Sequence, residues 1–323
     1  MPRLSILIPC LGPSAEFEDT LVSVLQNRPH DCEVILAHAS DYADPYRLSG
    51  EVCLLQVPEA RQHVTLLNAG FEAARSSIVH VVQCGLEVAE GWVEPALECF
   101  SEESVATVAP IIVDGESGNR VVSAGLGFSH WGRTYASSAG QKLGAQKPLA
   151  AEIVGPTLAA GFYRRRWWRH VRWNEALGDD FADAQFNLTL AKLGATTRLA
   201  ANSVLHGSPA QGMAADEPYG FSAARRAERL YWSQQATAGA GKMALRTALS
   251  LAEALLALPS PRAFTGVLGR FAALLERGAA EAFEQRVSEI AAGLADEQSQ
   301  AATISLDQVR QDRQSSRTTR RAA

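Results

Sequence analysis

The stretch Ile78–Trp92, IVHVVQCGLEVAEGW, decides the fold. It begins with a run of β-branched apolar residues, which is typical of a strand buried on both faces. The polar residues Gln83 to Glu87 interrupt this run, and a helix is predicted to begin near Gly91 and Trp92. In an open α/β sheet, ligands bind beyond the carboxyl ends of the strands, so the interruption marks the predicted functional site.

The same alternation of strand and helix continues on both sides of this stretch. Compact apolar runs predict strands at Leu4–Pro9, Cys32–Ala37 and Val52–Val57, and apolar residues at helical spacing follow the first and third of them. A last strand is predicted over Thr197–Leu205. Strands that alternate with helices predict βαβ units, and therefore an α/β fold with a mostly parallel sheet and helices on both faces.

The character of the sequence changes twice towards the carboxyl end. Residues 1–210 contain the strand-and-helix pattern, and residues 220–297 form an Ala- and Leu-rich helical pattern that predicts a C-terminal appendage. The polar residues 298–323 contain too little apolar surface to fold, which predicts a disordered tail.

Composition places the chain among ordinary globular proteins. Its 323 residues are 47% hydrophobic and carry a net charge of −5, which gives no reason to expect nucleic-acid binding. The five cysteines lie in the first hundred residues without a C-x-x-C pair, which favours reduced thiols over a disulfide framework. No leader-like segment precedes the first strand and no apolar run is long enough to span a bilayer, so the predicted location is the cytoplasm.

Several short motifs in this order resemble family-2 glycosyltransferases of the GT-A (Rossmann-like) fold. The resemblance covers roughly residues 3 to 207 and includes the Glu, Gly-Trp and helix that follow the strand at Ile78. The other motifs that carry it are Leu4–Cys10 (LSILIPC), Glu33–Ala37, Leu67–Ala74 (LNAGFEAA), Val122–Gly125, Ala160–Arg165, Trp173–Glu175, Ala182–Asp183 and His206.

The resemblance implies an inverting enzyme that moves a hexosyl group from a UDP-, GDP- or dTDP-sugar to a hydroxyl of a glycan, lipid or polysaccharide. Asp183 takes the place of the catalytic base, and Glu87 and His206 take the place of groups that flank the diphosphate or its metal ion. The residues implied in nucleotide-sugar binding are Pro9, Cys10, Leu11, His38, Asn68, Gln83, Cys84, Gly85, Arg164 and Arg165.

The departures from the family pattern concentrate on the chemistry. Gln83 and Gly85 stand where the family has the acidic residues of its D-x-D motif, and His38 stands where it has an aspartate. Hard divalent cations prefer carboxylate oxygens, so the degenerate motif predicts a weak or absent site for Mn²⁺ or Mg²⁺. Arginine side chains are the alternative means of neutralising the diphosphate, and Arg164 and Arg165 are the candidates.

Other interpretations remain open at this point. In one of them, the chain is a catalytically inactive GT-A relative that serves as a nucleotide-sugar-binding or protein-interaction module. Asp183 is in that case a solvated carboxylate on a helix face, and Glu87 a helix-capping residue. The basic residues 164–172 are either an exposed helix face or a surface for peripheral membrane contact. A dinucleotide enzyme is disfavoured because no G-x-G-x-x-G follows the first strand.

Overall fold

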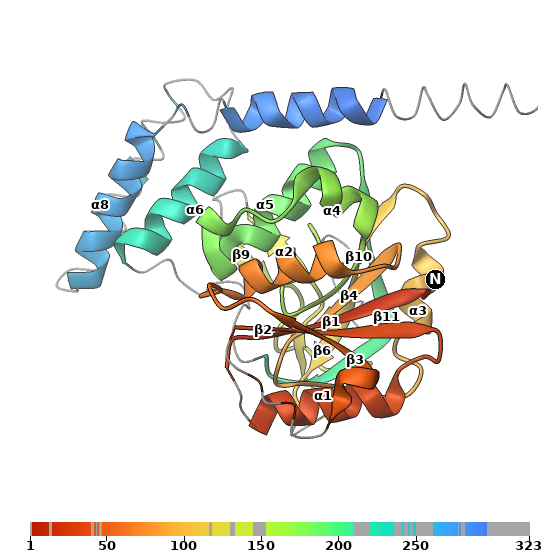
Figure 1. Ribbon diagram of the computed structural model, residues 1–323. Coiled ribbons are helices and arrows are strands. Elements are labelled where there is room, and N and C mark those ends of the chain that lie inside the picture. Colours follow the sequence, from red (N-terminus) through yellow and green to blue (C-terminus); the bar gives the residue numbers. More distant parts are fainter. Residues whose placement is uncertain are drawn as a thin grey trace, which may run out of the picture.

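A computed structural model gives the arrangement of most of the chain (Figure 1). It describes residues 2–12, 15–39, 42, 44, 47–115, 118–129, 133–144, 153–209, 220–234, 241, 245, 248–249, 261–276, 278 and 282–295. The predicted tail, 298–323, and most of the connection before residue 220 lie outside the described residues. Among the described helices, none combines the length and the apolar content needed to cross a bilayer.

One large mixed sheet forms the centre of the molecule. Its strands run in the spatial order β3-β2-β1-β4-β10-β6-β11-β5, and β7 pairs with β6. The strands are β1 (Leu4–Cys10), β2 (Cys32–His38), β3 (Val52–Gln56), β4 (Ile78–Val82), β5 (Leu86–Val88), β6 (Val105–Val113), β7 (Val121–Ser123), β10 (Ala160–Arg164) and β11 (Thr196–Gly207). A separate two-stranded sheet pairs β8 (Leu126–Phe128) with β9 (Thr134–Ala136).

The prediction of a mostly parallel α/β sheet is confirmed. Strands β1 to β4 are mutually parallel, and β11 is parallel to β6. Strand β10 is antiparallel to both of its neighbours, β4 and β6, and β5 is antiparallel to β11. The stretch after β4 therefore contains a short strand that the sequence did not predict, and the next helix begins at Glu94, later than expected.

Helices cover both faces of the sheet (Figure 1). On one face, Phe71 and Trp168 join strand residues such as Leu7 in one core cluster. On the other face, Phe17 and Val93 pack with Ile6 in a second cluster. The helices of the domain are α1 (Ala15–Asn27), α2 (His63–Ala73), α3 (Glu94–Cys99), α4 (Arg165–Val171) and α5 (Gly178–Lys192), with 3₁₀ turns η1 (Leu48–Gly50) and η2 (Glu175–Leu177).

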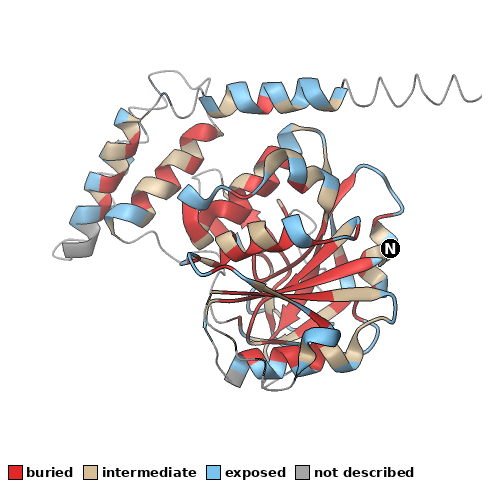
Figure 2. Cartoon of the chain, viewed as in Figure 1, coloured by how far each residue is buried: buried red, intermediate tan, exposed pale blue. Residues whose placement is uncertain are grey.

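The C-terminal segment is helical in its described residues. Helix α6 (Phe221–Ser233) packs along α8 (Pro261–Leu275), where a Cβ on Gly269 would lie 2.1 Å from the Phe221 carbonyl oxygen. Residues 282–295 are also helical, and an ion pair between Lys192 and Glu284 links them to α5. Figure 2 shows that burial concentrates in the sheet and its covering helices, whereas α8 keeps exposed positions.

A buried histidine joins β4 to its antiparallel neighbour. His80 is fully buried, its ring stacks on Phe162 at 3.7 Å, and its Nδ1 donates to the Gly161 carbonyl oxygen at 3.0 Å. Trp92 Nε1 donates to His80 Nε2 at 3.0 Å. Burial lowers the pKa of His80 to about 3, against the effect of the Gly161 hydrogen bond. His80 is therefore neutral and carries its proton on Nδ1.

We expect the His80 imidazole to stay neutral from neutral pH down to about pH 4, because its pKa is depressed to about 3. Nitrogen-15 NMR of the imidazole rings measures this directly and also identifies the tautomer. The urea-unfolded protein is the control, since its histidines titrate near their ordinary pKa of about 6.5. A doubly protonated His80 at about pH 6 in the folded protein would contradict the assignment.

Candidate functional site

The carboxyl ends of β1, β2 and β4 meet at one edge of the sheet. Pro9 and Cys10 end β1, and His38 ends β2 directly beside Cys10. The Cys84 thiol, in the turn after β4, donates to the Pro9 carbonyl oxygen at 3.3 Å. The structure thus brings together Pro9, Cys10, His38, Gln83, Cys84 and Gly85, and we call this group the strand-end cluster.

The turn Gln83–Leu86 explains why glycine occupies position 85. Leu86 N–H donates to the Gln83 carbonyl oxygen at 3.2 Å, and Gly85 has a φ of +88°. This left-handed conformation is one that side-chain-bearing residues adopt at a cost. Gly85 N–H is held by the Thr20 hydroxyl at 3.0 Å. Position 85 therefore offers no side chain to a metal ion, and its backbone conformation suits glycine.

Glu87 and His206 are direct partners on neighbouring antiparallel strands. Residue 206 of β11 lies opposite residue 87 of β5, in the register that also pairs Gly207 with Leu86. Directly opposite residues have Cβ atoms about 4.5–5.5 Å apart and project from the same face of the sheet. Glu87 is exposed and His206 is half-buried. The two residues therefore project from the same face of the sheet, next to the Gln83–Leu86 turn.

This pair is smaller than a full metal centre. Among the described residues, no group of three His, Cys, Asp or Glu side chains is placed to hold a metal ion. A carboxylate oxygen and an imidazole nitrogen are nevertheless ligands that Mn²⁺ accepts, so the donor set fits a weakly held divalent ion. Such an ion needs the oxygens of a bound diphosphate to complete its coordination.

Gln83 offers a hydrogen-bond acceptor at the same edge. Its side chain is 1% exposed, and its Oε1 atom has no hydrogen-bond partner within the part of the chain that the structure describes. Its backbone N–H donates to the Ala159 carbonyl oxygen at 2.9 Å. A buried acceptor without a partner is costly, so a donor group from a ligand would satisfy it.

Asp183 is buried beneath the segment that leads into β10. It is 2% exposed, and its carboxylate accepts from the Leu158 N–H at 3.2 Å and from the Ala184 N–H at 2.7 Å. Burial raises the pKa of Asp183 to about 7, against the effect of these backbone hydrogen bonds. The solvated helix-face carboxylate considered from the sequence is wrong, because the side chain is enclosed.

Three residues of α5 form one polar stripe at four-residue spacing. Asp179 accepts from the backbone N–H groups of His63 and Val64 at 3.0 and 2.8 Å and so caps α2. The Asp183 carboxylate accepts from the Leu158 N–H, and Asn187 Nδ2 donates to the Pro156 carbonyl oxygen at 2.9 Å. We call Asp179, Asp183 and Asn187 the α5 stripe. Residues four apart share a helix face, so this face of α5 positions the start of α2 and the loop that precedes β10.

The capping role of Asp179 was not predicted. Burial opposes ionisation, but hydrogen bonds from the His63 imidazole and from the His63 and Val64 N–H groups lower the pKa of Asp179. An acidic residue in the first turn of a helix normally signals an interaction with that same helix. Asp179 instead caps a helix more than a hundred residues earlier, which no local pattern encodes.

The structure does not bring Arg164 and Arg165 to the strand-end cluster. Arg164 pairs with Ile78 at the start of β4, which is the opposite edge of the sheet. Its guanidinium donates to the carbonyl oxygens of Phe100, Glu102 and Val105. Arg165 donates to the carbonyl oxygens of Phe71 and Glu72 at the end of α2. Both side chains thus bind main-chain carbonyl oxygens, away from the proposed diphosphate position.

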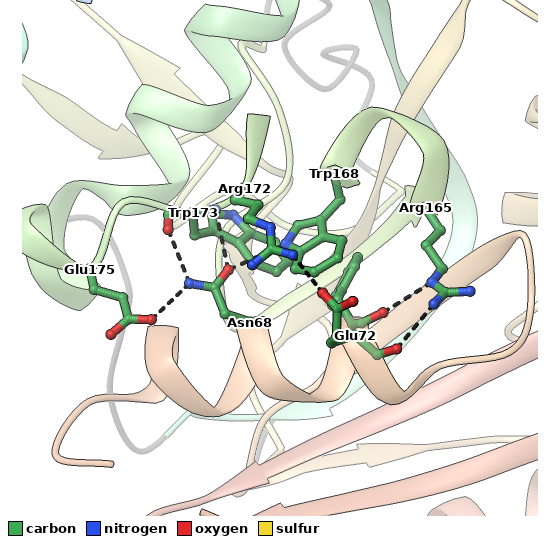
Figure 3. A network of polar contacts seen from close by, with 8 residues as sticks. Asn68, Glu72, Arg165, Trp168, Arg172, Trp173 and Glu175 are labelled. Atoms are coloured by element: carbon green, nitrogen blue, oxygen red, sulfur yellow. Dashed lines mark hydrogen bonds and ion pairs between the residues drawn. The ribbon is translucent and has the colours of Figure 1, made fainter. Parts of the chain in front are cut away.

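Asn68 has all of its hydrogen-bonding capacity engaged within the protein (Figure 3). Its Nδ2 donates to the Trp173 carbonyl oxygen and to Glu175 Oε1, both at 3.0 Å. Its Oδ1 accepts from Trp168 Nε1 and from the Trp173 N–H, both at 3.3 Å. An amide has two N–H donors and two lone pairs, so this network leaves none for a nucleotide. Asn68 ties α2 to the segment around α4.

His38 and Leu11 complete the predicted site. His38 is 6% exposed, and its ring lies 6.0 Å from that of Tyr42 in an edge arrangement. Leu11 follows Cys10 directly, is half-buried, and packs against the core on the α2 face. Both residues belong to the edge where β1 and β2 end, as predicted, although neither is extensively exposed.

The architecture of the chain is one that solved structures share. No protein-family model matches the chain. Its architecture is the GT-A fold of glycosyltransferases, because it is similar to the crystal structure of GalNAc-T7 with UDP, GalNAc and Mn²⁺. That likeness has a TM-score of 0.52 and 14% identity, and it covers 73% of this chain and 51% of that one. The predicted GT-A fold is confirmed.

Particular relatives are found among the curated proteins. Human polypeptide N-acetylgalactosaminyltransferase 12 is 28% identical over 184 residues, which are 50% of this chain and 31% of that protein. The mouse protein of the same name is 31% identical over 125 residues, or 35% of this chain and 21% of that protein. The match therefore spans less than a third of these relatives.

A second solved structure is similar over a longer part of the chain. The mannosyltransferase PcManGT from Pyrobaculum calidifontis, in complex with GDP-Man and Mn²⁺, has a TM-score of 0.47 and 14% identity, with 93% of this chain and 80% of that one covered. The curated relatives described above are glycosyltransferases, so the resemblance to glycosyltransferases of the GT-A fold is confirmed. The narrower assignment to family 2 stays a prediction.

Proposed function

We propose that the chain is a glycosyltransferase that transfers a sugar from a nucleotide-diphosphate donor to a hydroxyl acceptor with inversion. The observation that carries the proposal is the direct pairing of Glu87 with His206 beside the Gln83–Leu86 turn. The GT-A fold and the sugar-transferring relatives support it. Ligands of such sheets bind at the carboxyl ends of the strands, where this pair and the strand-end cluster lie.

The proposed donor site divides into two parts. Pro9, Cys10, Leu11 and His38 line the position of the nucleotide, and the Gln83 Oε1 atom accepts a hydrogen bond from a donor hydroxyl. In the second part, Glu87 and His206 lie beside the diphosphate and hold Mn²⁺ or Mg²⁺ together with it. A bound divalent ion would offset the negative charge that develops on the departing diphosphate.

Asp183 is the proposed base that takes the proton of the acceptor hydroxyl. A base works best when its pKa lies near the operating pH, and burial raises the pKa of Asp183 to about 7. Each carboxylate oxygen keeps a lone pair beyond the one that accepts from the backbone. Because Asp183 is 2% exposed, this role requires the Leu158 segment to move aside when the acceptor binds.

Titration calorimetry with UDP-, GDP- and dTDP-sugars, with and without Mn²⁺, tests the donor site. We expect one donor to bind, and to bind more tightly with the metal. Glu87→Gln and His206→Ala are each expected to weaken metal-dependent binding about tenfold, because each removes one ligand. Glu90→Gln is the matched control, since Glu90 is an exposed neighbour outside the β5–β11 pairing. Failure of all three donors to bind, with or without metal, would contradict the proposal.

The second candidate function is a nucleotide-sugar-binding module without catalysis. The observation that favours it is the position of Gln83 and Gly85 where acidic residues were expected, with no three-residue metal cluster in the described part of the chain. Release of free nucleotide diphosphate from the bound donor separates the two. Steady release in the presence of Mn²⁺ and an acceptor favours the enzyme, and tight binding without release favours the module.

A further inference from the structure

Two cysteines meet inside the strand-end cluster. Cys10 is the last residue of β1, and Cys84 lies in the turn that follows β4. Strands β1 and β4 are parallel neighbours, and beyond their pairing the Cys84 thiol donates to the carbonyl oxygen of Pro9, the residue before Cys10, at 3.3 Å. Both side chains belong to the same core cluster, and the Cys10 thiol donates to the Gly12 carbonyl oxygen at 3.1 Å. They are 4% and 7% exposed, so they lie just beneath the surface of the proposed donor site.

The positions of these residues suit a disulfide bond. The Cys84 Sγ atom lies 3.3 Å from the carbonyl oxygen of Pro9, the residue before Cys10, and disulfides join residues whose Cα atoms are about 4.4–6.8 Å apart. The remaining cysteines lie elsewhere: Cys32 begins β2, Cys53 is exposed on β3, and Cys99 ends α3. Cys10 and Cys84 are therefore the pair that the described structure prepares for oxidation.

The two thiols also differ in reactivity. The hydrogen bond with Cys84 lowers the pKa of Cys10, whereas that contact, followed by burial, raises the pKa of Cys84. The thiolate is the nucleophilic form of cysteine, so Cys10 is the member of the pair that reacts first. Cys84 is then the neighbouring thiol that completes the reaction.

We propose that Cys10 and Cys84 form a redox-sensitive dithiol that a peroxide converts to an intramolecular disulfide, and that this bond closes the donor site. The Cys10 thiolate attacks one peroxide oxygen, which gives a sulfenic acid and releases the other oxygen as water after protonation. The Cys84 sulfur then attacks the Cys10 sulfur, and the sulfenic oxygen leaves as a second water. Both cysteines are oxidised by one electron each and the peroxide is reduced by two.

The closure follows from where the bond forms, and this part rests on the proposed donor site. A disulfide would fix the Gln83–Leu86 turn to the end of β1, with Gln83 immediately beside the bond. The turn would lose the freedom to adjust around a diphosphate. Reduction by a thiol such as dithiothreitol would restore it.

The experiment treats the full chain with hydrogen peroxide and then alkylates the remaining thiols. Mass spectrometry of a digest is expected to show the peptides of Cys10 and Cys84 joined, with dithiothreitol reversing the link. Cys10→Ser and Cys84→Ser should each abolish the link, and Cys53→Ser should leave it unchanged. Oxidation of Cys53 while Cys10 and Cys84 can still be alkylated would overturn the proposal. This outcome can be observed with the wild-type protein alone.

Calorimetry with the nucleotide sugar that binds the reduced protein tests the closure. The disulfide form is expected to bind that donor at least tenfold more weakly than the reduced form. The affinity of Cys84→Ser, whatever its value, is expected to be the same before and after peroxide treatment. Equal binding by the reduced and disulfide forms would overturn the closure. If the reduced protein binds no donor, the proposed function fails, whereas the disulfide itself is still decided by the digest.

Discussion

Replacing Asp183 with asparagine is expected to remove the loss of folding stability that the wild type shows as pH rises towards 7, and to lower the rate of sugar transfer about 10²–10⁴-fold. Burial raises the pKa of the folded carboxyl to about 7, from an ordinary value of 3.8. As pH rises from about 4 to about 7, the unfolded carboxyl ionises while the buried one keeps its proton, so folding stability falls over this interval. Three pKa units correspond to roughly 4 kcal/mol as an upper bound. Asparagine removes this cost because it does not ionise.

Urea unfolding at about pH 5 and about pH 8 measures the effect as a difference between variant and wild type. The difference is needed because His80 acts in the opposite direction: its pKa is depressed to about 3, so its contribution is complete above about pH 6.5 and is lost as pH falls. Asp179→Asn is the matched control on the same stripe. Because the Asp179 pKa is lowered and the carboxylate caps α2, this variant is expected to be less stable at neutral pH.

The same variant tests the proposed base. Loss of a general base lowers the rate by about 10²–10⁴-fold, and the rate of the wild type is expected to rise with pH around the Asp183 pKa of about 7. Asp183→Asn should lose this rise while it still binds the donor. A variant that keeps both its rate and the pH profile would contradict the catalytic role and leave Asp183 as a positioning residue for Leu158.

Replacing Gly207 with alanine is expected to lower the free energy of unfolding by about 3 kcal/mol and to weaken metal-dependent donor binding at least tenfold. Gly207 ends β11 with a φ of +120°, and a Cβ there would lie 2.1 Å from the Gly85 carbonyl oxygen. The positive φ and the contact with the Gly85 carbonyl oxygen both involve the backbone, so no change of side-chain rotamer relieves either of them. The chain must separate β11 from the Gln83–Leu86 turn, and this displaces His206 from Glu87.

Gly194→Ala is the control for Gly207→Ala. Gly194 also has a positive φ, +80°, but nothing lies within 4 Å of a Cβ built there. Gly194→Ala should therefore lower the free energy of unfolding by about 1 kcal/mol, the cost of the left-handed conformation, and leave donor binding intact. Denaturant unfolding and calorimetry measure both variants. Equal losses of stability, with donor binding retained in Gly207→Ala, would show that the contact with Gly85 is unimportant.

The sequence predicted β1 to β4, β11 and the edge where β1, β2 and β4 end, because each of these strands is a compact apolar run that can be recognised without its partners. The run at Ile78–Val82 and the polar turn after it are visible without any partner strand. The short strand β5 was not predicted, since three residues carry too little periodicity. Because β5 pairs with β11, Glu87 and His206 are neighbours in the sheet although they are far apart along the chain.

The arginines show what local reasoning lacks. Arg164 and Arg165 follow Gly161 closely, and a parallel β10 would have carried them to the site edge. Because β10 runs antiparallel to β4 and β6, its carboxyl end lies at the opposite edge, and the arginines go with it. Strand direction is set by tertiary pairing, so no pattern within AGFYR reveals it. The same holds for Asp179, whose partners come from a distant segment.

The α5 stripe limits how this helix can change in length. Asp179, Asp183 and Asn187 share one face of the helix because each is four residues from the next, and each bonds to a different segment. Deleting or inserting one residue between them would rotate the following part of the helix by about 100° and carry its polar groups away from their partners. Natural variants of this chain should therefore gain or lose residues before Gly178 or after Lys192, and keep the length between Asp179 and Asn187 constant.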